Sequence, residues 1–195
     1  MKTTKKALIL TLCAVLLVVS TVFATMAYLT STTQVVKNTF TVGNVKITLD
    51  EAPVDEYGNV VAGDRVTENT YKLMPGHTYV KDPTIHVDAN SEDCWLFVKI
   101  VDEIAAIQDV TTVESQMLNN GWKKLEGDVW YYESVVSKNT DVPVFNNFKV
   151  LGNADVAAYN GKTITVIGYA VQADGFKSAS DAWAAAPSEW TPDAN

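Results

Sequence analysis

The chain of 195 residues has two histidines, His77 and His86, and these are its first candidates for metal chemistry. They lie nine residues apart, and no His-Glu-x-x-His motif occurs, so the arrangement of a helical zinc protease is absent. Together with Asp82 or Asp88 they could bind zinc, which accepts imidazole and carboxylate ligands. The alternative is two surface histidines, and the sequence favours it.

Other catalytic or ligand-binding patterns are equally sparse. No serine lies in a Gly-x-Ser-x-Gly motif, so no nucleophile elbow is indicated. Acidic pairs such as Asp102 and Glu103 are adjacent, and adjacent residues of a strand point to opposite faces. Acidic residues between 51 and 70 offer oxygen ligands to calcium, but their spacing matches no calcium loop. We therefore predict no catalytic residue and no bound cofactor.

Residues 1–27 have the layout of a secretory signal peptide. Three lysines form a basic start, residues 7–24 are almost entirely apolar, and small side chains follow at Thr25 and Ala27. The alternative is a retained transmembrane anchor, because the apolar run is close to the length that spans a bilayer. The small residues favour cleavage between Ala27 and Tyr28. The protein would then contact the membrane only through the signal segment before it is cleaved.

Removal of the signal changes both the charge and the cysteine count. The whole chain carries −8, but the signal holds three of its 15 basic residues and no acid, so residues 28–195 carry 12 minus 23, or −11. Such an acidic domain argues against nucleic acid as a partner. Cys13 leaves with the signal, and the remaining Cys94 cannot form an internal disulfide. A lone thiol can be reactive, but Cys94 opens an apolar run and we expect it to be buried.

Hydrophobic patterning indicates strands throughout the exported part. The candidate strands are residues 45–50, 84–88, 95–101, 121–125 paired with 129–132 in a hairpin, 142–151 and 163–172. Residues 95–101 are almost continuously apolar, which predicts a central strand, whereas Pro143 places 142–151 at a sheet edge. Two short helices are expected at 111–118 and 178–186, and the polar segment 51–70 is expected to form a long loop or a flexible hairpin.

These elements predict an all-β fold, a jelly-roll-like antiparallel β-sandwich with short helical excursions, preceded by an N-terminal signal helix. The expected division is a signal peptide at 1–27, a post-signal segment at 28–40, the β-sandwich domain at 41–186 and a polar C-terminal tail at 187–195. No internal repeat divides the sandwich domain further.

The order of four passages resembles the TasA/camelysin family of exported Gram-positive proteins that a SipW-type signal peptidase processes. The passages are Asn38–Leu49 with its Thr-Phe pair and following Gly, the Leu-x-Pro-Gly turn of Leu73–Asp82, the apolar strand Trp95–Ile100, and the closing strand Ile164–Phe176. Each passage alone has low specificity. Their order after a signal peptide carries the resemblance.

The resemblance implies a protein of the cell surface or biofilm matrix that forms fibres, with the SipW-type peptidase, further copies of the chain and other matrix proteins as partners. In such fibres the N-terminal segment of one subunit completes the sheet of the next, which is β-augmentation. Here residues 28–40 would be the donor strand, with Val35, Val36 and Phe40 as anchors. A disordered linker after the signal is the open alternative.

Two other functions compete with a structural role. The camelysin branch implies a surface metalloendopeptidase, with His77 or His86 near the metal, although the sequence has no recognisable zinc motif. An adhesin that binds glycans or proteins through exposed aromatic residues is the third possibility, and Trp190 in the tail is its best candidate.

We expect the secreted protein to begin at Tyr28, because Thr25 and Ala27 place small side chains at the two positions that a signal peptidase reads. N-terminal sequencing of protein recovered from the culture medium measures this directly. Ala27→Tyr removes the small side chain beside the cut and should leave the precursor unprocessed. A chain that keeps Met1 and sediments with membranes contradicts the prediction and supports the retained anchor.

Overall fold

A computed structural model describes residues 44–109 and 113–187 of the chain. Several predictions lie outside these residues: the signal peptide, the cleavage site at Ala27 and Tyr28, the anchors Val35, Val36 and Phe40, and Trp190. The described residues belong to one compact unit, Val42–Asn195.

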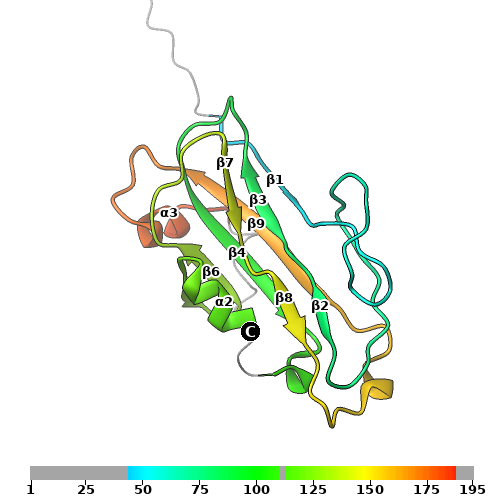
Figure 1. Ribbon diagram of the computed structural model, residues 1–195. Coiled ribbons are helices and arrows are strands. Elements are labelled where there is room, and N and C mark those ends of the chain that lie inside the picture. The colour runs from blue at the N-terminus through cyan, green and yellow to red at the C-terminus, as the bar shows by residue number, and fades with distance from the viewer. Residues whose placement is uncertain (1–43, 110–112, 188–195) are drawn as a thin grey trace, which may run out of the picture. The chain divides into compact units, whose positions relative to one another are not determined.

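The described residues form nine strands in three antiparallel sheets, with a few short helices (Figure 1), which confirms the all-β prediction. A three-stranded sheet has the order β1 (Ile47–Asp50), β3 (Thr84–Val87), β7 (Thr140–Pro143). A pair joins β2 (Thr78–Val80) to β8 (Asn147–Lys149). A four-stranded sheet has the order β5 (Trp122–Glu126), β6 (Val129–Tyr132), β4 (Cys94–Asp102), β9 (Ile164–Gln172).

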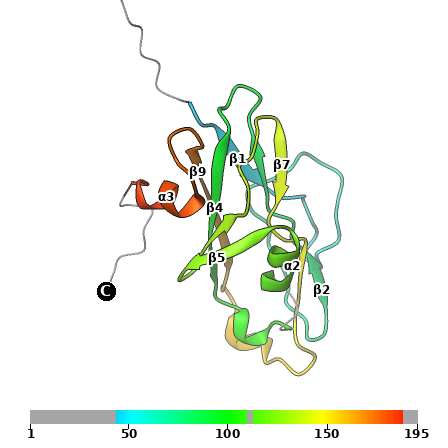
Figure 2. The same cartoon turned by 90° about the vertical axis from the view of Figure 1, so that its left-hand side faces the viewer.

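The two smaller sheets continue one another. β2 leads directly into β3, and β7 leads into β8. β3 pairs with β7, and β2 pairs with β8. Figure 1 shows β2 and β8 continuing the line of β3 and β7. Figure 2 shows the domain turned, with β4 and β9 in one layer and β2 and β7 in the other. The described part of the chain is therefore a two-layer β arrangement.

The core lies between these layers. Leu96 and Val98 of β4 are fully buried there, in one cluster with Ile85 and Val142 of the opposite layer. Cys94, the first residue of β4, is also fully buried, as predicted, and burial raises the pKa of its thiol to about 11.

The aromatic residues of the hairpin and of the last helix anchor their elements. Trp122 is fully buried, and its Nε1 donates to the carbonyl of Pro143 at 2.9 Å, which joins the β5–β6 hairpin to β7. The last helix, α3 (Ala179–Ala184), begins after Ser178, whose hydroxyl accepts from the Asp181 amide. Trp183 of this helix packs on Phe97 on the outer face of the four-stranded sheet.

The remaining helices are short. α2 (Val113–Asn119) forms where the sequence predicts a helix at 111–118, and it buries Met117 in the core. Single 3-10 turns form at η1 (Ala105–Ile107) and η2 (Val156–Tyr159). None of the helices within 44–109 and 113–187 is long and apolar enough to cross a membrane.

The single strand predicted for 142–151 is wrong in one respect. Its edge position is correct, because β7 is the edge of its sheet, but the segment forms parts of two strands, β7 and β8. Val144 and Phe145 between them are both fully buried, and two consecutive residues of a regular strand cannot face the same side. The loop predicted at 51–70 is confirmed, with isolated bridges from Glu51 to Val66 and from Val54 to Val60.

Gly58→Ala should lower the free energy of unfolding by roughly 2–4 kcal/mol, because it adds an overpacking cost to a left-handed backbone cost. Gly58 has a φ of 77°, and a Cβ there would lie 2.8 Å from the Cα of Tyr79. Gly161 has the same φ of 77° but no atom within 4 Å of the Cβ position. Gly161→Ala should therefore cost only about 1 kcal/mol. Urea unfolding measures both, and equal losses would contradict the packing argument.

Candidate functional site

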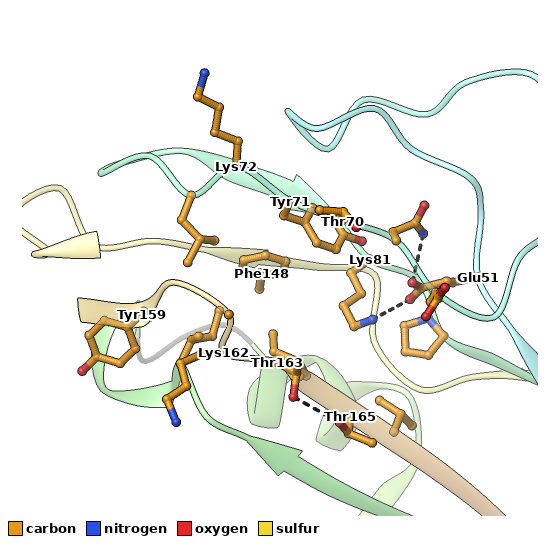
Figure 3. Close-up of a pocket in the computed structure, with 18 of the residues that line it drawn as sticks. Glu51, Thr70, Tyr71, Lys72, Lys81, Phe148, Tyr159, Lys162, Thr163 and Thr165 are labelled. Carbon is orange, nitrogen blue, oxygen red and sulfur yellow. Dashed lines mark hydrogen bonds and ion pairs between the residues drawn. The ribbon is translucent and has the colours of Figure 1, made fainter. Parts of the chain in front are cut away.

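A cleft of about 1090 Å³ opens on one side of the domain, lined by β1 and the loop after it and by η2 and the start of β9 (Figure 3). Its lining includes apolar side chains, of which Ile104 and Phe148 are buried. Exposed polar side chains surround these, and Figure 3 shows Lys72 and Lys162 pointing away from each other on opposite margins. The cleft therefore has an apolar floor and a polar rim.

The strands beside the cleft, β1 and β9, each lie at the edge of their sheet. The carbonyl of Lys46 accepts a hydrogen bond from the Asp88 amide, on the side of β3. Backbone groups alternate in direction along a strand, so those of Ile47 and Leu49 point to the opposite side. In the same way, the carbonyl of Thr163 accepts from Glu103, next to β4, so Val166 directs its backbone groups away from β4. Within the described residues, no strand pairs with either of these outer edges.

The two edge strands converge at Gly168. The position that a Cβ would occupy on Gly168 lies 3.4 Å from Ile85 Cδ1 and 3.6 Å from Ile47 Cδ1, so the absence of a side chain lets the layers meet closely there. On β9 the cleft lining starts at Val166, before Gly168, and runs back to Ile164. Glu51 lines the cleft opposite this part of β9. The cleft is therefore closed at one end by layer packing.

A buried charged group forms part of the cleft wall. Lys81 Nζ donates to Glu51 Oε2 at 2.7 Å, and Asn69 Nδ2 donates to Glu51 Oε1 at 2.9 Å. The side chains of Lys81 and Glu51 are 12% and 5% exposed. Figure 3 shows the amine of Lys81 next to Glu51, joined to it by a dashed line. Sequence reasoning missed this group, although a signal existed: Glu51 follows Ile47 and Leu49 in the inward phase of β1, where a charge needs a partner.

A second charged group covers the outer face of the β1–β3–β7 sheet. His86 on the central strand contacts Asp141 Oδ1 through Nδ1 at 2.7 Å and Asp50 Oδ1 through Nε2 at 2.9 Å. Carboxylates only accept hydrogen bonds, so both contacts are satisfied when the ring carries two protons. Partial burial lowers the pKa of His86, but the hydrogen bonds that its ring donates to Asp141 and Asp50 outweigh this effect and hold that pKa above its ordinary value.

Arg65 connects this group to the long loop. Its guanidinium pairs with Asp50 and lies 3.0 Å from Asp82 Oδ2, and it also donates to the backbone carbonyls of both residues. Partial burial raises the pKa of Asp50, yet the hydrogen bonds with Arg65 and His86 bring it below the ordinary value. The loop is therefore fixed to β1 by ionic contacts on the outer face as well as inside the cleft.

The two histidines proposed as metal ligands contact different residues. His77 Nε2 lies 2.8 Å from the Tyr57 carbonyl and its ring packs on Tyr79, whereas His86 contacts Asp50 and Asp141 rather than Asp82 or Asp88. Among residues 44–109 and 113–187, no three His, Cys, Asp or Glu side chains are arranged to hold a metal ion.

The acidic cluster considered for calcium has a local structural role. Asp55 Oδ1 accepts from the backbone amides of Tyr57 and Asn59, at 3.0 Å and 2.9 Å. This hydrogen bonding is typical of a side chain that stabilises a turn. Asp55 therefore shapes the loop between β1 and β2.

Comparison of the chain with protein-family models, with curated proteins and with solved structures finds no match. The resemblance to the TasA/camelysin family stays a prediction that rests on the four sequence passages. The described residues define a class by themselves: an antiparallel β domain with a lateral cleft between two unpaired strand edges. A functional proposal has to start from that cleft.

His86→Asn should destabilise the domain in acid and leave it nearly unchanged in alkali. The folded-state pKa of His86 is raised, so its contribution is complete below the ordinary value of 6.5 and is lost as the pH rises through the folded value. We expect a loss of about 1 kcal/mol near pH 5 that vanishes near pH 9. Urea unfolding across this range measures the loss. Asp141→Asn, which removes one of the two carboxylates beside the ring, should give a smaller loss with the same pH dependence. A loss that does not depend on pH would contradict the charged-imidazole interpretation.

Proposed function

We propose that this protein is a non-enzymatic structural protein of the cell surface or biofilm matrix of a Gram-positive bacterium. In this proposal its two β layers are a jelly roll, and subunits assemble into fibres by strand donation. Residues 28–40 of one subunit enter the cleft between β1 and β9 of the next. The signal peptide expected at 1–27 and the resemblance to the TasA/camelysin family support export and assembly.

The observation that carries the proposal is the pair of outer strand edges beside an apolar floor. Unpaired N–H and C=O groups of an edge strand are a template for another strand. Those of β1 and β9 face the side on which the cleft opens. An incoming strand can use these backbone groups for affinity and the floor for register, which are the two components of β-augmentation.

The expected donor has a suitable pattern. In an extended strand Val36 and Phe40 share one face, and Val35 lies on the other. We propose that Val36 and Phe40 contact the floor around Phe148, and that Val35 faces the opposite wall. Thr30 to Thr33 precede these anchors with four hydroxyl side chains, which keep the segment soluble before it pairs.

Removal of residues 28–40 should abolish filaments, because the deleted protein keeps the acceptor cleft but has no strand to donate. Negative-stain electron microscopy compares protein 28–195 with protein 41–195, which retains the compact unit Val42–Asn195. A labelled peptide of residues 28–40 should bind the shortened protein one to one. Filaments formed by the shortened protein would end the strand-donation proposal.

A matched pair of variants tests the position of the acceptor. Val156→Lys, in the cleft lining, should weaken peptide binding by about tenfold, which corresponds to about 1.4 kcal/mol. Val135→Lys changes a valine that is 41% exposed and does not line the cleft, and it should leave binding unchanged. Equal effects of the two variants would place the acceptor elsewhere on the domain.

A further inference from the structure

We propose that Lys81 and Asn69 form an intramolecular isopeptide bond, with Glu51 as the proton-transfer residue. The three side chains meet in the cleft wall, where one carboxylate contacts both reacting groups. Lys81 provides an amine, Asn69 provides a carboxamide, and Glu51 holds each through a different oxygen. This inference does not depend on fibre assembly.

The position of Glu51 suits the transfer of protons between the two groups. Its Oε2 lies 2.7 Å from Lys81 Nζ, and its Oε1 lies 2.9 Å from Asn69 Nδ2. Transfer of one ammonium proton along the first contact produces a neutral amine, which is a nucleophile, and a neutral carboxyl group. That carboxyl group can then donate the proton to the nitrogen that leaves, as general acid catalysis requires.

The carboxamide of Asn69 is held by its backbone surroundings. Its Oδ1 accepts from the Val54 amide at 3.0 Å, and its Nδ2 also donates to the Ala52 carbonyl at 2.9 Å. The Val54 N–H therefore points at the oxygen on which negative charge develops when the amine attacks. A backbone donor in this position stabilises a tetrahedral intermediate. The contacts also fix which atom of Asn69 is the leaving group.

The reaction balances without a cofactor or an oxidant. Lys81 Nζ attacks Asn69 Cγ, the Nζ–Cγ bond forms, and the Cγ–Nδ2 bond breaks. Nζ loses two protons as the amide forms: one passes through Glu51 to Nδ2, which leaves as ammonia, and Glu51 keeps the other as a neutral carboxyl group. The product is a secondary amide, and no group is oxidised or reduced.

The surroundings favour this chemistry over a solvated ion pair. Glu51 and Lys81 are 5% and 12% exposed, and apolar residues line the same cleft, among them Leu49, Pro83 and Phe148. Little water is available to stabilise two full charges, and a neutral amide removes that cost. The bond would join the loop that follows β1 to the residue that follows β2.

Mass spectrometry of the full-length secreted protein tests the proposal directly. We expect an intact mass lower than the sequence mass by one ammonia. Trypsin should not cut after Lys81, and it should release residues 66–72 covalently joined to residues 73–99. A full intact mass after prolonged incubation at neutral pH, with a free peptide 73–81, would show an ion pair only and overturn the proposal.

Variants separate this bond from other losses of ammonia. Asn120-Gly121 and Asn160-Gly161 can lose ammonia by succinimide formation, which does not involve a lysine. Lys81→Arg and Glu51→Gln should both restore the full mass, whereas Lys72→Arg, at an exposed lysine of the same cleft, should keep the loss. A loss that persists in Lys81→Arg would refute the bond. If a variant fails to fold, the joined peptide of the unaltered protein still decides the question.

Discussion

The nine-residue antiparallel pairing of β4 with β9 determines how the rest of the domain is arranged. Its register places Leu96 opposite Ala170 and Val98 opposite Gly168, so large residues of β4 face small residues of β9 on the core side. The small residues let the second layer approach, with Ile85 against Gly168. On the other face the same register places Phe97 beside Tyr169, which makes the aromatic surface that α3 covers (Figure 2). One pairing thus produces the core and the platform for the last helix, and it leaves the outer edge of β9 beside the cleft.

The loop after β1 is fixed from both faces of that strand. Asp50 and Glu51 are neighbours in the sequence and point to opposite faces, so each meets a different cation. Arg65 binds Asp50 on the outer face, and Lys81 binds Glu51 within the cleft wall. The outer contacts are partly solvated and contribute little each. The inner contact is buried, so loss of either partner would leave an uncompensated charge. The wall of the cleft therefore depends mainly on Glu51 and Lys81.

The sequence predicts the strands well because alternation is a local property. The patterns at 84–88 and 163–172 identify β3 and β9 to within a residue, and the apolar run at 95–101 identifies the central strand β4. The cleft could not be predicted in this way. Lys81 lies 30 residues from Glu51, and His86 lies 55 residues from Asp141, so only the folded topology brings these pairs together. Asp50 and Glu51 point to opposite faces, as adjacent residues of a strand do, but this rule does not show that each acid has a distant partner.

A fixed cleft wall has a consequence for the strand donation that we propose. An incoming segment loses backbone and side-chain entropy when it becomes a strand, and the free energy of binding has to exceed that loss. If the acceptor also had to become ordered, the loss would occur on both sides of the interface. Glu51 and Arg65 fix the loop beside β1, and packing at Gly168 fixes the closed end of the cleft. In the assembly proposed here the acceptor cleft would therefore be ordered before a strand arrives, so the ordering cost would fall mainly on the donor. Alternation of apolar residues in the donor then decides which segments can pair, because a shift by one residue turns every anchor away from the floor.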